Sequence, residues 1–110
     1  MTLAAKKCIP CRIGAPTLKP AEVKKFLKQV SKKWVAKENP QRLERVFEFK
    51  DFKKALAFVN KVGDLAEKEG HHPNMRLFAY KYVEVALWTH KIGGLHENDF
   101  ILAAKIDSLT

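Results

Sequence analysis

The sequence contains few cysteines. Its two cysteines, Cys8 and Cys11, are separated by two residues, and no second Cys or His pair of matching spacing follows to complete a four-ligand zinc site. A thiol redox pair is expected between a strand and a helix, whereas residues 14–20 (GAPTLKP) have the composition of a loop. We therefore expect a reduced tail at this position, and a metal or disulfide shared between chains stays open.

Signals for membranes and secretion are also missing. The longest apolar runs are far shorter than the roughly 20 residues of a membrane-spanning helix, and the first eight residues lack the apolar core of a signal peptide. No internal repeat or low-complexity segment is present. A chain of 110 residues can bury a single core. We therefore expect a cytoplasmic protein with one domain.

The net charge of +9 is concentrated in one part of the chain. Residues 1–37 contain ten Lys or Arg and one acid, Glu22, whereas residues 38–110 contain eleven of each sign. Such an excess can attract nucleic acid or an acidic partner. However, no aromatic side chains are interleaved with these lysines, as single-strand binding requires. We interpret the excess as a solvated helix face with a loose tail and do not expect nucleic acid as a partner.

Residues 1–19 are expected to form a flexible N-terminal tail, and residues 20–110 a single domain. The domain is predicted to begin with a helix near Pro20, because proline suits the first helical turn. The apolar residues at helical spacing in this first helix are Val23, Phe26, Leu27, Val30 and Trp34. A short strand is predicted next, at residues 34–38.

A β-hairpin and a second helix are predicted next. Residues 43–50 alternate between apolar and polar side chains, which predicts a strand that pairs with the preceding one across an Asn-Pro turn. Asp51 can cap a helix that runs to Glu69. Gly70 is suited to the left-handed conformation that ends a helix.

Residues 75–89 are predicted to be extended. This length and a break in the alternation predict two strands with a bend near residues 79–81. The Gly93–Gly94 pair turns the chain into a last helix over residues 97–108. The fold class is therefore α+β, with a four-stranded antiparallel sheet, helices packed on one face and the order α-β-β-α-β-β-α.

All four histidines lie between residues 67 and 99. His71 and His72 follow a helix end, where the dipole favours a charged imidazole, and they are held between a glycine and a proline. His90 ends an apolar run, and we expect it to end a strand. Histidine has the unperturbed pKa nearest neutrality, so this cluster is a natural place for proton transfer.

Three further interpretations concern the partners of these histidines. Adjacent histidines in an extended segment point to opposite sides, so we expect no metal at Glu67, His71, His72 and His90. Glu67 lies one helical turn before His71 and can hydrogen-bond an imidazole. Asp99, at the third position of the last helix, is expected to accept hydrogen bonds from first-turn amides, a structural rather than catalytic role.

This spacing resembles the signature of the pterin-4a-carbinolamine dehydratases. The matching residues are Glu67, His71-His72-Pro73 after three residues, Tyr80 after six, His90 after nine and Asp99 after eight. The resemblance extends upstream to Trp34 and to residues 47–70, and it covers residues 20–107. It implies the α+β fold predicted above and a metal-free hydro-lyase without a cofactor.

The resemblance implies dehydration of 4a-hydroxytetrahydrobiopterin to quinonoid dihydropterin in tetrahydrobiopterin recycling. A general acid must protonate the departing hydroxyl, and a base must take the N5 proton. We assign His71 and His90 to this acid/base work and His72 to substrate binding and proton transfer, with Glu67 in the catalytic set. The residues expected to line the pterin pocket are Gly70, His71, His72, Pro73, Trp88, Thr89, His90 and Lys91.

Two positions depart from the family pattern. Family members commonly have Ser or Thr where this chain has His96, so we expect a poorly capped last helix. Trp88 replaces a small hydroxyl residue found in some members. Whether position 88 lines the site through its side chain or its backbone stays open.

The resemblance also implies partners. We expect a homodimer or homotetramer, a pterin substrate and a functional link to an aromatic amino acid hydroxylase. The alternative function is a protein-interaction module, because family members are known as dimerisation cofactors of a homeodomain transcription factor and an exposed sheet edge invites pairing. The intact histidines favour catalysis over this coactivator role.

Overall fold

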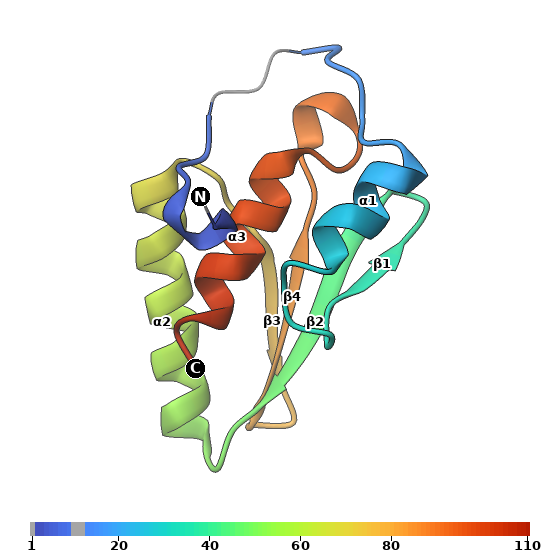
Figure 1. Ribbon diagram of the computed structural model, residues 1–110. Helices are drawn as coiled ribbons and strands as arrows, with labels where there is room; N and C mark the ends of the chain where they lie inside the picture. The colour runs from blue at the N-terminus through green and yellow to red at the C-terminus, as the bar shows by residue number, and fades with distance from the viewer. Residues whose placement is uncertain (1, 10–12) are drawn as a thin grey trace.

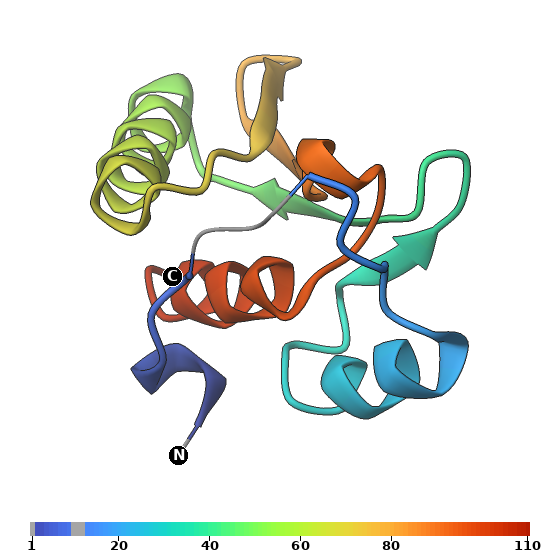
Figure 2. The ribbon, with the colours of Figure 1, turned by 90° about the horizontal axis from the view of Figure 1, so that it is seen from above.

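The computed structural model describes residues 2–9 and 13–110, in which three α-helices cover one face of a four-stranded antiparallel sheet (Figure 1). The view from above shows all three helices on the same side of the sheet (Figure 2). The predicted α+β class and element order are confirmed. The elements are η1 (Leu3–Ala5), α1 (Pro20–Leu27), β1 (Val35–Lys37), β2 (Arg42–Glu48), α2 (Phe52–Glu69), β3 (Asn74–Phe78), β4 (Tyr82–Leu87), η2 (His90–Ile92) and α3 (Glu97–Asp107).

The sheet has the order β1-β2-β4-β3, so β2 and β4 form its centre. Leu43 pairs with Leu87 and Phe47 with Val83 across the two central strands. Because strand side chains alternate between faces, these residues and Val85 share the face under the helices, where all five are buried. Burial of this face fixes the register of β4, and with it the position of the residues that follow the strand.

Helix α2 begins and ends at the predicted residues. The Asp51 carboxylate accepts a hydrogen bond from the backbone N–H of Lys54 at 2.8 Å, which caps the first turn. Gly70 has φ 65°, the left-handed conformation that the sequence predicted. Helix α2 therefore stops where the His71–His72 pair begins, and it delivers both histidines to the upper end of the molecule in Figure 1.

Helix α1 is shorter than its apolar stripe predicted. It ends at Leu27, so Val30 and Trp34 lie outside it. The Ser31 backbone N–H donates to Asp107 Oδ2 at 2.9 Å instead of continuing the helical ladder. Trp34 enters the core from this loop, and its indole N–H donates to Asp107 Oδ1 at 2.8 Å. The prediction of one stripe from Val23 to Trp34 was therefore wrong beyond Leu27.

Residues 2–9, here called the N-terminal strap, make specific contacts with the domain. Leu3 is buried against the core formed by α3. The Lys6 ammonium lies 2.7 Å from a carboxylate oxygen of Glu97 at the start of α3. The sequence did not predict these contacts, because a single turn of 3₁₀-helix has too few residues to show hydrophobic periodicity. Cys11, the second cysteine, lies outside the described residues.

Helix α3 has a better cap than the sequence predicted. His96 Nδ1 accepts a hydrogen bond from the Asn98 backbone N–H at 3.0 Å. In return, Asp99 Oδ2 accepts from the His96 backbone N–H at 2.9 Å. The two bonds form a capping box in which histidine replaces the usual serine or threonine. The expectation that His96 caps poorly was wrong, because an unprotonated imidazole nitrogen is an adequate acceptor.

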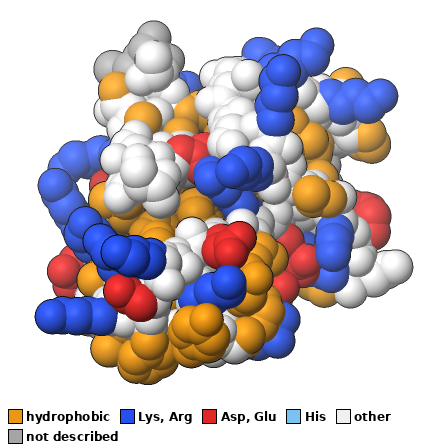
Figure 3. All heavy atoms as spheres, turned by 90° about the horizontal axis from the view of Figure 1, so that it is seen from below, with side chains coloured by type: hydrophobic (Ala, Val, Ile, Leu, Met, Phe, Trp, Pro, Cys, Tyr) orange, Lys and Arg blue, Asp and Glu red, His pale blue; other side chains and the backbone are white. Residues whose placement is uncertain are grey.

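The lower end of the molecule carries the turns between elements. Ala79 and Tyr80 have φ 46° and 57°, which places the predicted bend between β3 and β4. Figure 3 views this end and shows acidic and basic side chains mixed with hydrophobic ones rather than one charged patch. Within residues 2–9 and 13–110, every helix is too short or too polar to cross a bilayer.

Candidate active site

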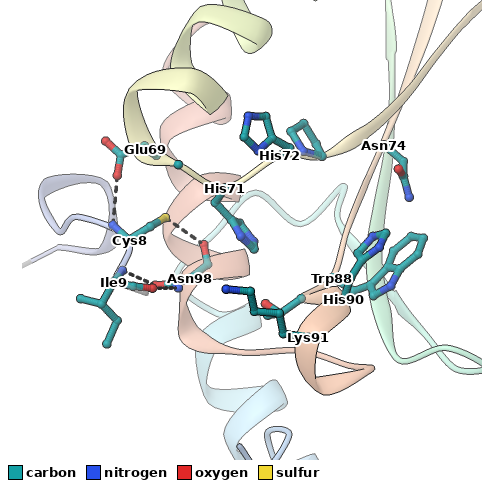
Figure 4. Close-up of a pocket in the computed structure, with 13 residues that line it drawn as sticks. Cys8, Ile9, Glu69, His71, His72, Asn74, Trp88, His90, Lys91 and Asn98 are labelled. Atoms are coloured by element: carbon teal, nitrogen blue, oxygen red, sulfur yellow. Dashed lines mark hydrogen bonds between the residues drawn. The ribbon is translucent and has the colours of Figure 1, made fainter. Parts of the chain in front are cut away.

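A cavity of about 550 Å³ lies where α2 ends and β3, η2 and α3 begin. Its lining contains all eight residues that the sequence predicted for the pterin pocket, whereas Glu67 is not in it. The chain segments 70–74 and 88–91, which are far apart in sequence, thus contribute facing walls (Figure 4). The full lining is Cys8, Ile9, Glu69, Gly70, His71, His72, Pro73, Asn74, Trp88, Thr89, His90, Lys91 and Asn98.

His71 is held by a buried carboxylate. Its Nε2 lies 2.6 Å from Asp99 Oδ1. The Asp99 side chain is fully buried, and the His71 side chain is 13% exposed. A carboxylate accepts hydrogen bonds, so the contact places the ring proton of a neutral His71 on Nε2. His71 Nδ1 is then the nitrogen that can take up a proton.

Asp99 is itself fixed from two further directions. The Thr89 hydroxyl donates to Asp99 Oδ2 at 3.0 Å, and the His96 backbone N–H donates to the same oxygen. The start of α3 and the segment after β4 therefore each donate a hydrogen bond to the Asp99 carboxylate. The sequence predicted that Asp99 accepts hydrogen bonds from backbone amides at the start of α3. It did not predict the contact with His71, because the two residues are 28 positions apart along the chain.

His72 has a different environment from its neighbour. Its Nε2 contacts Glu67 Oε2, and both side chains are mostly exposed, at 62% and 78%. The sequence predicted that Glu67 can hydrogen-bond an imidazole, and the imidazole it contacts is that of His72. The two histidines point to different sides of the chain. Among the described residues, no three His, Cys, Asp or Glu side chains are arranged to hold a metal ion.

His90 stacks on Trp88 at the other side of the cavity. The ring centroids are 4.5 Å apart, and the planes differ by 6°. Strand β4 ends at Leu87, and His90 begins η2 rather than ending the strand as the sequence suggested. Gly93, with φ 68°, ends η2 in the left-handed conformation. Trp88 thus lines the cavity with its side chain, and the stacked pair presents a flat aromatic surface (Figure 4).

The sequence did not predict the wall formed by the N-terminal strap. The Cys8 backbone N–H donates to Glu69 Oε1 at 3.0 Å. The Ile9 backbone N–H donates to Asn98 Oδ1 at 3.0 Å, and Asn98 Nδ2 donates back to the Ile9 carbonyl at 2.5 Å. No local pattern around Cys8 indicated these contacts, since their partners lie 61 and 89 positions away along the chain.

Charges at this wall perturb two ionisable groups. Burial and the nearby Glu69 and Asp99 carboxylates raise the pKa of the Cys8 thiol to about 12. For Glu69, burial favours the neutral acid, but the Cys8 N–H and the Lys105 ammonium, 3.5 Å away, outweigh it and lower the pKa of the carboxyl. At neutral pH the wall therefore has a protonated thiol and a buried, paired carboxylate.

Known proteins share this architecture. A sequence model of the family described as pterin 4 alpha carbinolamine dehydratase matches residues 16–109. A protein of Alkaliphilus metalliredigens (strain QYMF), named as a candidate pterin-4-alpha-carbinolamine dehydratase, is 51% identical over 105 residues, which cover 96% of this chain and 93% of the relative.

Two solved structures are also similar. One, described as a transcriptional coactivator/pterin dehydratase from Brucella melitensis, gives a TM-score of 0.78 at 32% identity and covers 86% of this chain and 98% of that chain. The other is a pterin dehydratase-like protein identified as a RuBisCO assembly factor in the alpha-carboxysome. It gives a TM-score of 0.59 at 28% identity and covers 69% of this chain and 87% of that chain. Since the family model spans most of the sequence and the relatives align over nearly its full length, the chain belongs to the pterin-4a-carbinolamine dehydratase family.

Proposed function

We propose that the protein dehydrates 4a-hydroxytetrahydrobiopterin to quinonoid dihydropterin and water by histidine acid/base catalysis. Membership of the dehydratase family supports the reaction. The observation that carries the mechanism is the buried His71–Asp99 pair in the wall of a cavity whose facing wall is the Trp88–His90 stack.

The reaction requires two proton transfers at neighbouring atoms of the substrate. The 4a-hydroxyl leaves with the electron pair of the C4a–O bond after it accepts a proton, so the product is water. The N5–H proton goes to a base, and the electrons of that bond form the new C4a–N5 double bond. One acid and one base near neutral pKa therefore suffice, and the histidines of the cavity have the appropriate chemistry.

His71 and His90 are the acid/base residues in this proposal. Asp99 fixes the tautomer of His71 and leaves Nδ1 able to exchange a proton. His90 lies across the cavity and is exposed, so its ring can reach the substrate and exchange protons with water. His72 contributes to binding and proton transfer from the rim, where Glu67 orients it.

The cavity also suits a flat heterocycle. The Trp88–His90 surface offers a stacking platform for the pterin ring, a contact that contributes about 0.5–1.5 kcal/mol beyond burial for aromatic pairs. The Asn74 side chain and the polar groups of residues 70–73 lie at the edge, where they can hydrogen-bond the amide and amino groups of the ring. A role in tetrahydrobiopterin recycling beside an aromatic amino acid hydroxylase, and assembly as a homodimer or homotetramer in the cytoplasm, belong to the same proposal.

A stopped-flow dehydration assay with synthetic carbinolamine tests this function. We expect the wild type to accelerate dehydration, and His71→Ala and His90→Ala each to lower the rate by about 10²–10⁴-fold, the usual contribution of one positioned acid or base. His96→Ser is the matched control, because His96 does not line the cavity and serine preserves the N-cap. All variants must keep the native circular dichroism spectrum.

The assay distinguishes a wrong assignment of one histidine from a wrong activity of the protein. A wild-type rate in a folded His71→Ala or His90→Ala variant would remove that histidine from the mechanism. If the wild type itself did not accelerate dehydration, the enzymatic proposal would fail.

A second candidate function is a protein-interaction role. The observation that favours it is the sheet face that the helices leave uncovered, where Val35 and Val46 are 52% and 49% exposed and lie on the same side. Family resemblance to a coactivator and to an assembly factor agrees with such a role. Light scattering of the wild type and Val46→Lys tests it, because a face that pairs with another chain would lose that association when it carries a charge.

A further inference from the structure

The N-terminal strap (residues 2–9) lies outside the part of the chain that the family model matches, which begins at residue 16. Even so, Cys8 and Ile9 line the cavity. Figure 4 shows Cys8 on one side of His71 and the Trp88–His90 stack on the other. We propose that the strap is a positioning segment of the active site, which closes this side of the cavity and keeps water from the His71–Asp99 pair. The catalytic part of this inference rests on the proposed function.

The strap is attached at both ends of its described length. At one end, Leu3 is only 3% exposed and packs into the core beside α3. At the other end, the backbone N–H groups of Cys8 and Ile9 donate to Glu69 and Asn98, and Asn98 donates back to the Ile9 carbonyl. Three hydrogen bonds to two side chains, one of them a carboxylate, hold this end of the strap against the ends of α2 and α3.

The two attachment points lie directly beside the catalytic pair. Glu69 precedes His71 by two residues at the end of α2, and Asn98 immediately precedes Asp99 in the first turn of α3. The same two helix ends therefore hold His71 and Asp99 together and hold the strap over them. The Asp99 charge acts on the Cys8 thiol across this short separation.

Exclusion of water has a direct consequence for the pair. A hydrogen bond between an imidazole and a carboxylate is stronger where few waters compete for either partner. Asp99 is fully buried and His71 nearly so with the strap in place. Release of the strap would give water access to this side of the pair, so the orientation of the His71 ring would be less well defined.

The test measures access to His71 without relying on catalysis. Diethylpyrocarbonate modifies imidazoles, and mass spectrometry of the peptide that contains residues 71 and 72 separates the two sites. Cys8→Pro in the full chain removes the N–H that binds Glu69. We expect the rate of carbethoxylation of His71 to rise by about tenfold, because loss of a hydrogen bond to a charged acceptor favours local opening by about this factor. His72 is already exposed, so its rate should not change.

Two further full-chain variants complete the design. Leu3→Asp detaches the strap at its other end and should reproduce the rise at His71. Lys7→Gln is the matched control, because Lys7 belongs to the strap but its side chain is exposed, does not line the cavity and makes none of the contacts that attach the strap. In the dehydration assay, Cys8→Pro and Leu3→Asp should lower kcat/KM by about tenfold through both kcat and KM, whereas Lys7→Gln should match the wild type.

Each result decides the inference. Unchanged His71 carbethoxylation in folded Cys8→Pro and Leu3→Asp would overturn it, and so would an equal rise at His72. If the wild type had no dehydratase activity, carbethoxylation would still decide whether the strap covers His71. The failure of the proposed function and the failure of this inference are therefore separate outcomes.

Discussion

His71 and His72 are neighbours in the sequence and each contacts a carboxylate through Nε2, but the two contacts differ in burial and in the number of groups that hold the carboxylate. His71 contacts a fully buried carboxylate that has two further donors. His72 contacts a carboxylate on the surface, and both partners are mostly exposed to solvent. An extended backbone sends adjacent side chains to opposite sides, so one residue step separates a buried contact from a solvent-exposed one.

This difference indicates how the two histidines divide the work. A buried carboxylate that two further donors hold in place fixes both the tautomer and the ring orientation of its histidine. An exposed contact with a carboxylate contributes little to the orientation of the ring and weakens with salt. In our proposal His71 is therefore the positioned acid/base residue, and His72 is the adaptable residue at the rim. The predictions below alter one side of this comparison at a time.

The largest effect is expected from Asp99→Asn. The amide group of asparagine would present a donor to His71 Nε2, which reverses the tautomer and places the ring proton on Nδ1. We expect kcat to fall by about 10³–10⁴-fold, the scale seen where an orienting carboxylate is lost from a catalytic histidine. The dehydration assay measures this loss, and a decrease of less than about tenfold would contradict the role of Asp99.

A smaller effect is expected from Thr89→Val. This change removes one of the donors to Asp99 and leaves the others in place. We expect kcat to fall by about tenfold and the free energy of unfolding to fall by about 1–2 kcal/mol, because a buried acceptor loses one hydrogen bond. Thr89→Ser keeps the hydroxyl and is the matched control. Equal activity of the valine and serine variants would show that the bond does not contribute.

Glu67→Gln should have a still smaller effect on activity. Glu67 is 78% exposed and pairs with the exposed His72, so its charge is screened by water and salt. We expect the rate to change by less than about threefold at physiological ionic strength. Comparison with Asp99→Asn in the same assay tests the difference between the two histidines, and similar losses in both variants would contradict it.

Glu69→Gln should affect stability with a defined dependence on pH. The pKa of Glu69 in the folded protein lies below its ordinary value of 4.5, so the ionised carboxylate stabilises the fold above that pH. This stabilisation is lost as the pH falls through the folded-state pKa. We expect the variant to melt a few degrees below the wild type at neutral pH and the gap to narrow in acid.

Glu97→Gln is the control for this series of melting curves, because Glu97 contacts the same strap from a more exposed position. A gap for Glu69→Gln that stayed constant down to acid pH would contradict the assignment of the stabilisation to its carboxylate.

The sequence predicted the elements whose signals are local. The caps of α2 follow from Asp51 and Gly70, the bend between β3 and β4 from a break in the alternation of side chains, and the position of α3 from the Gly93–Gly94 turn. Helix α1 was extended too far because Val30 and Trp34 continued its apolar spacing. That spacing reflects burial from a loop whose backbone is bound by Asp107, a residue 76 positions from Ser31.

The candidate site was predicted as a set of residues but not as a set of pairs. The family motif indicated eight residues that lie in the cavity wall, but it did not indicate the part of the wall that Cys8, Ile9 and Asn98 form. Which carboxylate holds which histidine depends on the packing of α3 against the end of α2, and no local pattern contains that information. The strap was missed for the same reason, since Leu3 and Cys8 contact residues near the other end of the chain.

The two tryptophans give the molecule an intrinsic optical probe. Trp34 is 4% exposed and its indole is bound to Asp107, so its emission should be blue-shifted and insensitive to what enters the cavity. Trp88 stacks on His90 in the cavity wall, where both a ligand ring and the charge of the imidazole alter its excited state. A change in fluorescence during a titration with a pterin should therefore come from Trp88, and Trp88→Phe should abolish it. The fold thus provides an internal reference emitter and a reporter of occupancy at the proposed catalytic surface, without an added dye.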